Sequence, residues 1–213
     1  MAERTGIFGG TFDPIHFGHL RPALELKQQL SLSSVRLLPC HRPSHRGAPG
    51  ATTAQRIEML TLAIAGCDGL VIDTRESMRD APSYTFDTLT SFRQQSPNAS
   101  LLFFMGMDAF AGFTGWHKWE GILELAHLVV IERPGSSVSG AEERLLMQRQ
   151  ARNVSSLTDT SGSIIVQSVS QSDISATRIR ALVNKGDDIR FLLPETVREY
   201  ILDHGLYRDD EAE

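Results

Sequence analysis

The chain has 213 residues, and its content of 41% hydrophobic and 22% charged residues is ordinary for a globular protein with a sizeable core. The formal net charge of -5 argues against a general binder of nucleic acid or of membrane surfaces, because both require a basic excess. Cys40 and Cys67 have no metal-ligand spacing, and the chain shows neither a membrane-length apolar run nor an apolar signal core. We therefore expect a reduced, cytoplasmic protein without nucleic-acid or membrane partners.

Short apolar runs alternate along the chain with longer segments of helical period, a pattern that predicts βαβ units and a parallel sheet. Strands are predicted at residues 5–9, 34–38, 70–73, 101–105, 128–132 and 164–166. Helices are predicted at residues 18–30, from the cap Thr52 to about 65, 83–95, 141–151, 175–184 and 194–204. The fold class that follows is α/β: a Rossmann-like, doubly wound, mostly parallel sheet with helices on both faces and a small C-terminal helical part.

The predicted organisation is one domain over residues 1–213. A Rossmann-like core occupies about 1–170, a C-terminal helical part about 171–208, and a frayed acidic tail 209–213. The polar segment 136–162 is interpreted as an insertion of low functional interest. In a doubly wound sheet, ligands bind at the carboxyl ends of the strands, so we expect the site there.

The turn after the first strand, F-G-G-T-F-D-P-I-H-F-G-H-L, combines features that suit a bound phosphate. Gly9 and Gly10 let backbone N–H groups approach an anion, and the helix that follows adds partial positive charge. His16 and His19 are one helical turn apart, so both imidazoles can face one pocket. The P-loop lysine is missing, which argues against an ordinary P-loop enzyme. A plain turn with structural histidines remains an alternative, as does a metal pair, although no third ligand has a convincing spacing.

The same turn resembles the H-x-G-H signature of the nucleotidyltransferase superfamily, and I-S-A-T-R-I-R at residues 174–180 resembles its second signature. The resemblance extends over nearly the whole chain to the bacterial nicotinate-nucleotide adenylyltransferase family. Further matching elements are P-S-H-R at 43–46, P-S-Y-T at 82–85, G-M-D at 106–108, T-G-W at 114–116 and R-P-G at 133–135. Phosphopantetheine adenylyltransferases and class I aminoacyl-tRNA synthetases fit less well in motif and length.

This resemblance implies transfer of the adenylyl group of ATP to nicotinate mononucleotide, with release of pyrophosphate. The attacking phosphate has a second pKa of about 6, so it is largely ionised near neutral pH and needs no general base or covalent intermediate. The reaction needs alignment of two polyanions and neutralisation of the leaving charge. Mg²⁺ carried by the ATP phosphates is implied as the cofactor, and no residue pattern spells out a protein cage for it.

The resemblance also implies roles for individual residues. The implied catalytic residues are His16, His19 and Arg180. The implied ATP contacts are Gly9, Gly10, Thr11, Phe12, His16, His19, Gly106, Asp108, Ile174, Ser175, Thr177 and Arg180. The implied mononucleotide contacts are His45, Arg46, Tyr84, Thr85, Trp116 and Arg133.

Several of these roles have a physical basis. The indole of Trp116 offers a flat face to a pyridine ring, and the helix start at Tyr84 and Thr85 offers N–H groups to the nicotinate carboxylate. Asp108 suits a ribose or nucleotide contact, with a helix N-cap as the competing interpretation. Cys40 and Ala109 depart from the family, which usually has asparagine and serine there, so ligand contacts at both positions are in doubt.

Other prominent residues are interpreted as structural or exposed. Glu25 and Glu58 are expected to face solvent, Trp119 to pack, and Arg178 to serve either the ligand or a solvated helix face. His117, His127 and His204 are expected to be structural or exposed. Two functions remain open as alternatives: an adenylyltransferase for nicotinamide mononucleotide or another phosphorylated acceptor, and a non-catalytic nucleotide sensor. The oligomeric state is not readable from the pattern.

Overall fold

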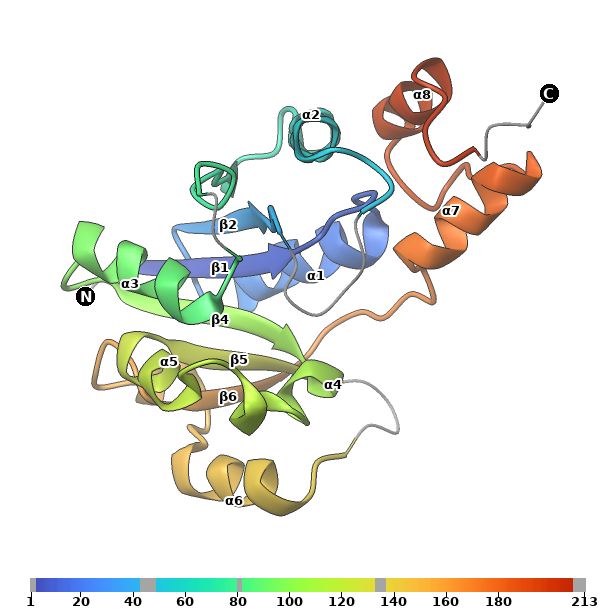
Figure 1. The fold of residues 1–213 in the computed structure, drawn as a ribbon. Helices are drawn as coiled ribbons and strands as arrows, with labels where there is room; N and C mark the ends of the chain where they lie inside the picture. Colours follow the sequence, from blue (N-terminus) through green and yellow to red (C-terminus); the bar gives the residue numbers. More distant parts are fainter. Residues whose placement is uncertain (1–2, 43–48, 80–81, 133–136, 209–213) are drawn as a thin grey trace.

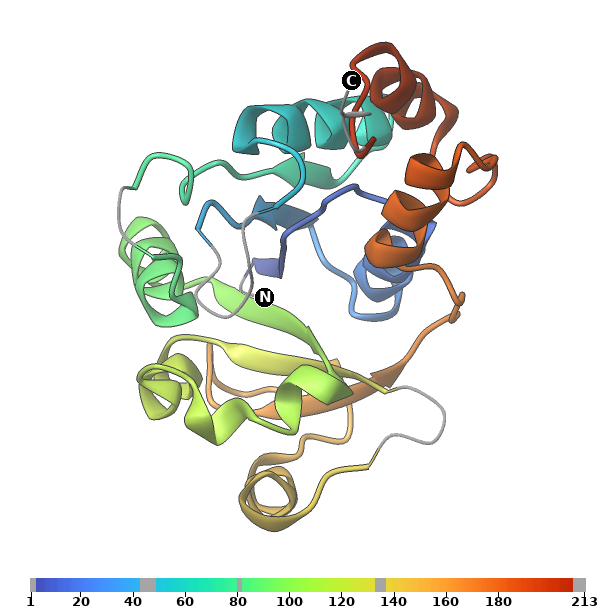
Figure 2. The same cartoon turned by 45° about the vertical axis from the view of Figure 1, so that its right-hand side comes forward.

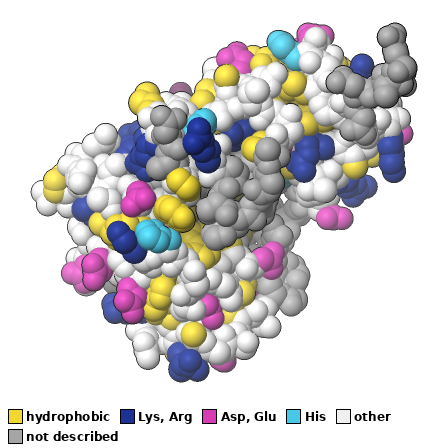
Figure 3. All heavy atoms as spheres, in the orientation of Figure 1, with side chains coloured by type: hydrophobic (Ala, Val, Ile, Leu, Met, Phe, Trp, Pro, Cys, Tyr) yellow, Lys and Arg dark blue, Asp and Glu magenta, His cyan; other side chains and the backbone are white. Residues whose placement is uncertain are grey.

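The computed structural model describes residues 3–42, 49–79, 82–132 and 137–208. The predicted site residues His45, Arg46 and Arg133, and the predicted tail 209–213, lie outside the described residues. Among the described helices, none combines the length and the apolar character that a membrane crossing requires. In the space-filling view, acidic and basic side chains are interspersed over the visible face, in keeping with a modest net charge (Figure 3).

In the part of the chain that the structure describes, six strands form one sheet in the order β3-β2-β1-β4-β5-β6 (Figure 1). They are β1 (Arg4–Gly10), β2 (Ser34–Pro39), β3 (Leu70–Ile72), β4 (Ser100–Gly106), β5 (His127–Glu132) and β6 (Ile164–Ser168). Every neighbouring pair is parallel, so the sheet is wholly rather than mostly parallel. The strands β1, β2 and β3 follow one another toward one edge of the sheet. The chain then crosses back, and β4 pairs with the other side of β1. The doubly wound prediction is therefore confirmed, with the switch point between β1 and β4.

Two hydrophobic cores form, one on each face of this sheet. One core receives side chains from α1 (Phe17–Gln29), α2 (Thr53–Ile64), α7 (Ala176–Lys185) and α8 (Glu195–Asp203). The other receives them from α3 (Thr85–Gln95), α4 (Met107–Phe110), α5 (Trp119–Leu125) and α6 (Gly140–Arg149). Neighbouring residues of β4 alternate, since Phe103 enters the second core and Phe104 the first. The turned view separates the two helix layers (Figure 2).

Every strand and helix predicted from the sequence is present, with ends that differ by at most two residues. Thr52 caps α2 as predicted, because its hydroxyl accepts the N–H of Gln55 while the Gln55 side chain accepts the N–H of Thr52. The short helices α4 and α5 and the 3₁₀ turns η1 (Phe113–Gly115) and η2 (Val154–Ser156) were not predicted. Helices of one or two turns depend on tertiary packing rather than on propensity, and α5 packs against α3.

The burial of Glu25 differs from the expectation based on the sequence. Glu25 was expected to face solvent, but only 8% of its surface is exposed. Its carboxylate accepts the backbone N–H of Ser170 at 2.6 Å and pairs with Arg21. The loop after β6 covers this side of α1, a contact across 145 residues that helical periodicity does not report. Glu58 is exposed, as expected.

Candidate active site

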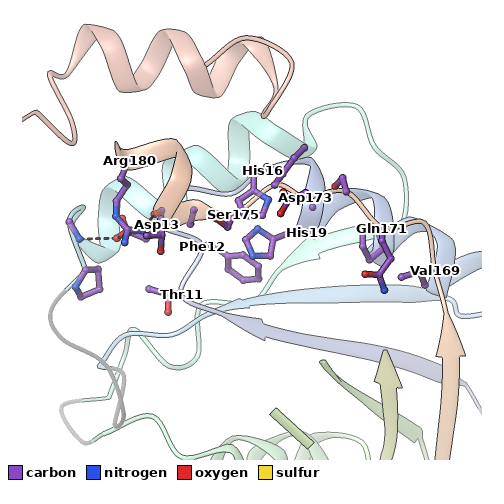
Figure 4. A pocket seen from close by; sticks show the side chains of 18 of the residues that line it. Thr11, Phe12, Asp13, His16, His19, Val169, Gln171, Asp173, Ser175 and Arg180 are labelled. Atoms are coloured by element: carbon purple, nitrogen blue, oxygen red, sulfur yellow. Dashed lines mark hydrogen bonds and ion pairs between the residues drawn. The ribbon is translucent and has the colours of Figure 1, made fainter. Parts of the chain in front are cut away.

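A cavity of about 1090 Å³ opens where the turn after β1 meets the start of α7 (Figure 4). Two segments at opposite ends of the chain form most of its wall. From the first segment come Thr11, Phe12, Asp13, His16, Gly18 and His19; from the second come Ile174, Ser175, Thr177 and Arg180. The loops around Gly50 and Ser170 complete the lining. The two sequence signatures are therefore brought together in one cavity.

The two histidines lie side by side at the N-terminus of α1. The backbone of His16 is extended, and its carbonyl accepts the N–H groups of His19 at 2.9 Å and Leu20 at 3.1 Å, which starts the helix. The two imidazole rings stack with centroids 3.8 Å apart, and the Phe12 ring stands edge-on to His19 at 5.1 Å. The expectation that both imidazoles face one pocket is confirmed.

His16 is buried as a neutral ring. Only 4% of its surface is exposed, and this burial lowers its pKa to about 4. Within the described residues, its Nδ1 atom is buried and has no hydrogen-bond partner. Gly18 makes room for the ring, since a Cβ there would lie 2.9 Å from the imidazole and 3.0 Å from the carbonyl oxygen of Ile174. A buried polar atom without a partner is costly, so its placement in the cavity wall favours a bound ligand that completes it.

Asp13, in the cavity wall, joins the signature turn to three other segments. Its carboxylate accepts the N–H groups of Gly50 at 2.8 Å and Ala51 at 3.0 Å, and the hydroxyl of Tyr207 at 2.8 Å. Arg180 donates from Nη1 to the Asp13 backbone carbonyl at 2.7 Å, and the same nitrogen is 3.8 Å from Oδ2. Burial, with the Asp13 carboxylate nearby, raises the pKa of Tyr207, so its hydroxyl keeps its proton.

The second signature begins a helix that points its N-terminus at the cavity. Ser175 caps α7, because its hydroxyl accepts the N–H of Arg178 at 3.3 Å. Thr177 and Arg180 follow within the first turns and line the cavity. A helix N-terminus with hydroxyl and guanidinium donors is an anion-binding arrangement. Arg178 instead lies near the exposed Asp173 at 3.7 Å and is absent from the lining.

Comparison with known proteins agrees with this geometry. The cytidylyltransferase-like family matches residues 7–182. A protein from Cellvibrio japonicus, named as a probable nicotinate-nucleotide adenylyltransferase, is 48% identical over 211 residues, which cover 98% of this chain and all of the relative. A protein of the same name from Aeromonas hydrophila is 47% identical over 95% of this chain and 96% of its own length. The chain belongs to the nicotinate-nucleotide adenylyltransferase family.

A solved structure shares the fold of this family member. The nicotinic acid mononucleotide adenylyltransferase of Plasmodium falciparum, in complex with NaAD, superposes with a TM-score of 0.76 over 96% of this chain and 97% of that one. The two sequences are only 18% identical, so this similarity concerns the fold. The Rossmann-like class predicted from the sequence is thereby confirmed.

Some residues predicted to contact ATP in this adenylyltransferase do not line the cavity. Gly9 and Gly10 end β1, and Gly106 ends β4, so these glycines flank the switch point between the two strands. Apart from Gly106 and its two chain neighbours, no described residue has a heavy atom within 4 Å of the place where a Gly106 Cβ would stand. Gly106 rather than Asp108 holds the N-cap position of α4, and Asp108 is exposed in its first turn.

The described members of the predicted mononucleotide contacts, Tyr84, Thr85 and Trp116, lie outside this cavity, at the same edge of the sheet. Tyr84 is the N-cap residue of α3 and Thr85 its first residue, as predicted. The Tyr84 ring lies 4.5 Å from that of His117, an exposed residue. Trp116 is half-buried, with its ring 6.4 Å from Phe103 and 5.7 Å from Phe113. Helix starts and loops that follow parallel strands gather at their carboxyl ends, which explains the shared edge.

The T-G-W turn of this family member is held by α6, inside the segment interpreted as an insertion of low interest. One carboxylate oxygen of Glu142 accepts both the N–H of Thr114 at 3.1 Å and its hydroxyl at 2.7 Å. The hydroxyl bond is the main cause that lowers the pKa of Glu142. Glu142 is buried, whereas its neighbour Glu143 is exposed. The insertion thus contacts a predicted substrate element.

Arg56 was missed by the sequence analysis. Its guanidinium is fully buried and donates to the carbonyl oxygens of Thr11 at 2.6 Å, Cys40 at 2.8 Å and Ala51 at 3.3 Å. Burial lowers its pKa, but an arginine remains charged at neutral pH. It ties the signature turn to the ends of the neighbouring loop. One signal was available, since Arg56 shares a helix face with the buried Leu60.

Asp13 and Tyr207 were missed for different reasons. Asp13 was interpreted only as part of a turn signal, although an aspartate inside a phosphate-binding turn is a candidate for an internal contact. Tyr207 lies 194 positions from its partner, and no local pattern connects the two. His127, expected to be structural or exposed, is buried, with Nε2 3.1 Å from the Asp159 carbonyl and Nδ1 accepting the N–H of Ser163.

Proposed function

We propose that the protein transfers the adenylyl group of ATP to nicotinate mononucleotide, giving nicotinate adenine dinucleotide and pyrophosphate in NAD biosynthesis. The observation that carries this proposal is the meeting of the H-x-G-H turn and the I-S-A-T-R-I-R helix in one cavity. Near full-length similarity to relatives with the corresponding name supports the choice of substrates.

In this proposal the cavity binds the ATP triphosphate. The N-terminus of α7, the hydroxyls of Ser175 and Thr177, and the guanidinium of Arg180 are donors on one side. His16 and His19 are donors on the other, and an approaching polyanion favours the protonated form of the buried His16. These groups stabilise the negative charge that grows on the departing pyrophosphate, which is the main demand of the step. A cavity built of fixed donors meets that demand without reorganisation.

The acceptor acts as its own nucleophile in the proposed reaction. An oxygen of the mononucleotide 5′-phosphate forms a bond to the α-phosphorus of ATP. The bond between that phosphorus and the oxygen that bridges it to the β-phosphorus breaks. Pyrophosphate leaves with that bonding electron pair. Because the attacking phosphate is already ionised, the protein supplies alignment and charge stabilisation rather than a general base.

Mg²⁺ is proposed to enter with ATP. Among the described residues, no group of three or more His, Cys, Asp or Glu side chains could hold a metal ion. Mg²⁺ retains several waters and is commonly bound through substrate phosphates, so phosphate oxygens suit it here. When bound, it neutralises charge on the triphosphate. The cavity side chains then orient the phosphates that carry it.

The mononucleotide is proposed to occupy the neighbouring part of the same sheet edge. Trp116 would stack on the pyridine ring, and the N-terminus of α3 at Tyr84 and Thr85 would receive the nicotinate carboxylate. His45, Arg46 and Arg133 are proposed to contact its phosphate side, and they lie outside the described residues. An acid-specific contact at α3 predicts a preference for the acid over the amide.

The test is a turnover assay with ATP, Mg²⁺ and either nicotinate or nicotinamide mononucleotide, in which pyrophosphate and dinucleotide are measured. We expect a higher kcat/KM for the acid, and about a 10²-fold lower kcat for His19→Ala, the size typical of one lost oxyanion contact. His204→Ala, at an exposed ring that contacts only its own helix turn among the described hydrogen bonds, serves as the control. Preference for the amide would favour the alternative acceptor, and ATP binding without turnover would favour a sensor.

A further inference from the structure

Tyr207, which follows the end of α8, contacts Asp13 in the cavity wall. Its backbone adopts a positive φ of 63°, which is uncommon for a residue with a side chain. Its hydroxyl donates to Oδ1 of Asp13 at 2.8 Å. Its ring packs over Gly50, where an added Cβ would lie 3.1 Å from the ring carbons. Both contacts hold the ring in one place.

Asp13 transmits this contact to the cavity. Asp13 is only 4% exposed, and its carboxylate accepts the N–H groups of Gly50 and Ala51 in addition to the Tyr207 hydroxyl. These three donors orient both carboxylate oxygens in a fixed direction. The Oδ2 atom lies 3.8 Å from Nη1 of Arg180, and the Asp13 carbonyl accepts from that same nitrogen at 2.7 Å.

Arg180 is therefore held by a residue that Tyr207 itself helps to orient. The guanidinium lines the cavity and is about one-third exposed, so it can still meet a ligand there. The planar guanidinium of an arginine binds phosphate through N–H groups that point in fixed directions as well as through its charge. A small rotation of the guanidinium would therefore weaken the contact. Three segments far apart in sequence, at Asp13, at Gly50 and at Tyr207, thus meet beside one cation.

We infer that Tyr207 is a positioning residue of the ATP site, which acts through Asp13 to aim Arg180 at the triphosphate. This inference rests on the proposed function and adds to it a part of the chain beyond both signatures. It assigns Tyr207, after the end of α8, to the nucleotide site, although no sequence motif marks this residue.

The experiment removes only the hydroxyl, with Tyr207→Phe, and uses Tyr200→Phe as the matched control. Tyr200 lies on α8, stacks on His204 at 4.0 Å and does not line the cavity. We expect Tyr207→Phe to raise the Kd and KM for ATP about tenfold, the usual size for a lost hydrogen bond to a charged group, with the KM for the mononucleotide unchanged. Tyr200→Phe should leave both constants unchanged.

A double-mutant cycle distinguishes an effect of Tyr207 on the position of Arg180 from an effect on the stability of the whole protein. If Tyr207 acts through Arg180, the change Tyr207→Phe should have little further effect on ATP in an Arg180→Ala background. Equal effects in both backgrounds, an equal rise in the KM for the mononucleotide, or no effect at all would overturn the inference. Gly50→Ala, which displaces the Tyr207 ring while keeping its hydroxyl, replaces Tyr207→Phe should that variant fail to fold.

Calorimetric titration with ATP measures the affinity of each variant without turnover, so the inference can be tested independently of the proposed reaction. Wild-type protein that binds ATP but does not turn over would contradict the proposed reaction, while the ATP affinities of the variants would still decide the inference. Wild-type turnover with an unchanged Tyr207→Phe variant would contradict the inference alone.

Discussion

At the scale of single residues, the central feature is a histidine buried without charge in a site that meets polyanions. An ammonium group at the position of His16, where only 4% of the residue surface is exposed, would carry a permanent charge out of water at a large desolvation cost. An imidazole avoids that cost by remaining neutral until an anion arrives. This difference explains why the signature turn uses histidine where a P-loop uses lysine.

The burial of His16 predicts a dependence of stability on pH. Its pKa is about 4 in the folded protein and 6.5 when unperturbed, so the unfolded chain binds a proton between these values and the native state does not. The free energy of unfolding should therefore fall as pH falls from about 6.5 to about 4, by about 3 kcal/mol in total. Urea unfolding at several pH values measures this loss.

A variant isolates the contribution of His16 from that of His127, whose pKa burial also lowers. His16→Gln should show a shallower loss of stability over the same pH range, while the His127 contribution stays. Parallel pH profiles for the wild type and this variant would contradict the interpretation of His16 as the buried neutral group.

At the scale of elements, α6 supports the T-G-W turn. This helix carries Leu145 into the second core and presents Glu142 to Thr114. Short 3₁₀ turns such as η1 have weak internal hydrogen bonding, so an external carboxylate that accepts two donors decides their geometry. Trp116 follows η1 directly, and the insertion therefore supports the proposed ring platform.

Glu142→Ala should leave the N–H and hydroxyl of Thr114 without this acceptor. We expect a loss of about 1–3 kcal/mol in unfolding free energy and a higher KM for the mononucleotide, with the KM for ATP unchanged. Glu143→Ala, at the exposed neighbour, is the matched control and should change neither quantity. A rise in both KM values would show that the helix supports the fold as a whole instead.

At the scale of the whole molecule, the two cores share one sheet. Each central strand sends alternate side chains to either core, and the C-terminal helices α7 and α8 bury Ile179, Val183, Val197 and Ile201 in the same core as α1. A C-terminal part that completes a core cannot easily unfold while that core persists. We therefore propose that residues 1–213 form one domain, which unfolds as one cooperative unit.

One domain predicts one cooperative transition. Scanning calorimetry should give a single peak whose calorimetric enthalpy equals the van't Hoff enthalpy, and ATP with Mg²⁺ should raise its midpoint as a whole. Two resolved transitions, only one of which responds to ATP, would show instead that the C-terminal helical part unfolds on its own.

Local patterns in the sequence were sufficient for the fold class and for the two segments that line the cavity. The continuous apolar run L-L-F-F-M and the helical spacing after the H-x-G-H turn express burial directly, so strands and long helices were predicted within two residues. The histidine pair was predictable for the same reason, because one helical turn brings the two rings together.

Tertiary structure decided the rest. The burial of Glu25 and Glu142 and the links of Arg56 and Tyr207 to the signature turn depend on partners between 28 and 194 positions away. The helix α5 depends on packing that a short segment cannot provide alone. A polar side chain has the same local pattern whether it faces water or a distant donor. Only the fold brings the donor to it, and the low dielectric of the interior then makes that contact strong.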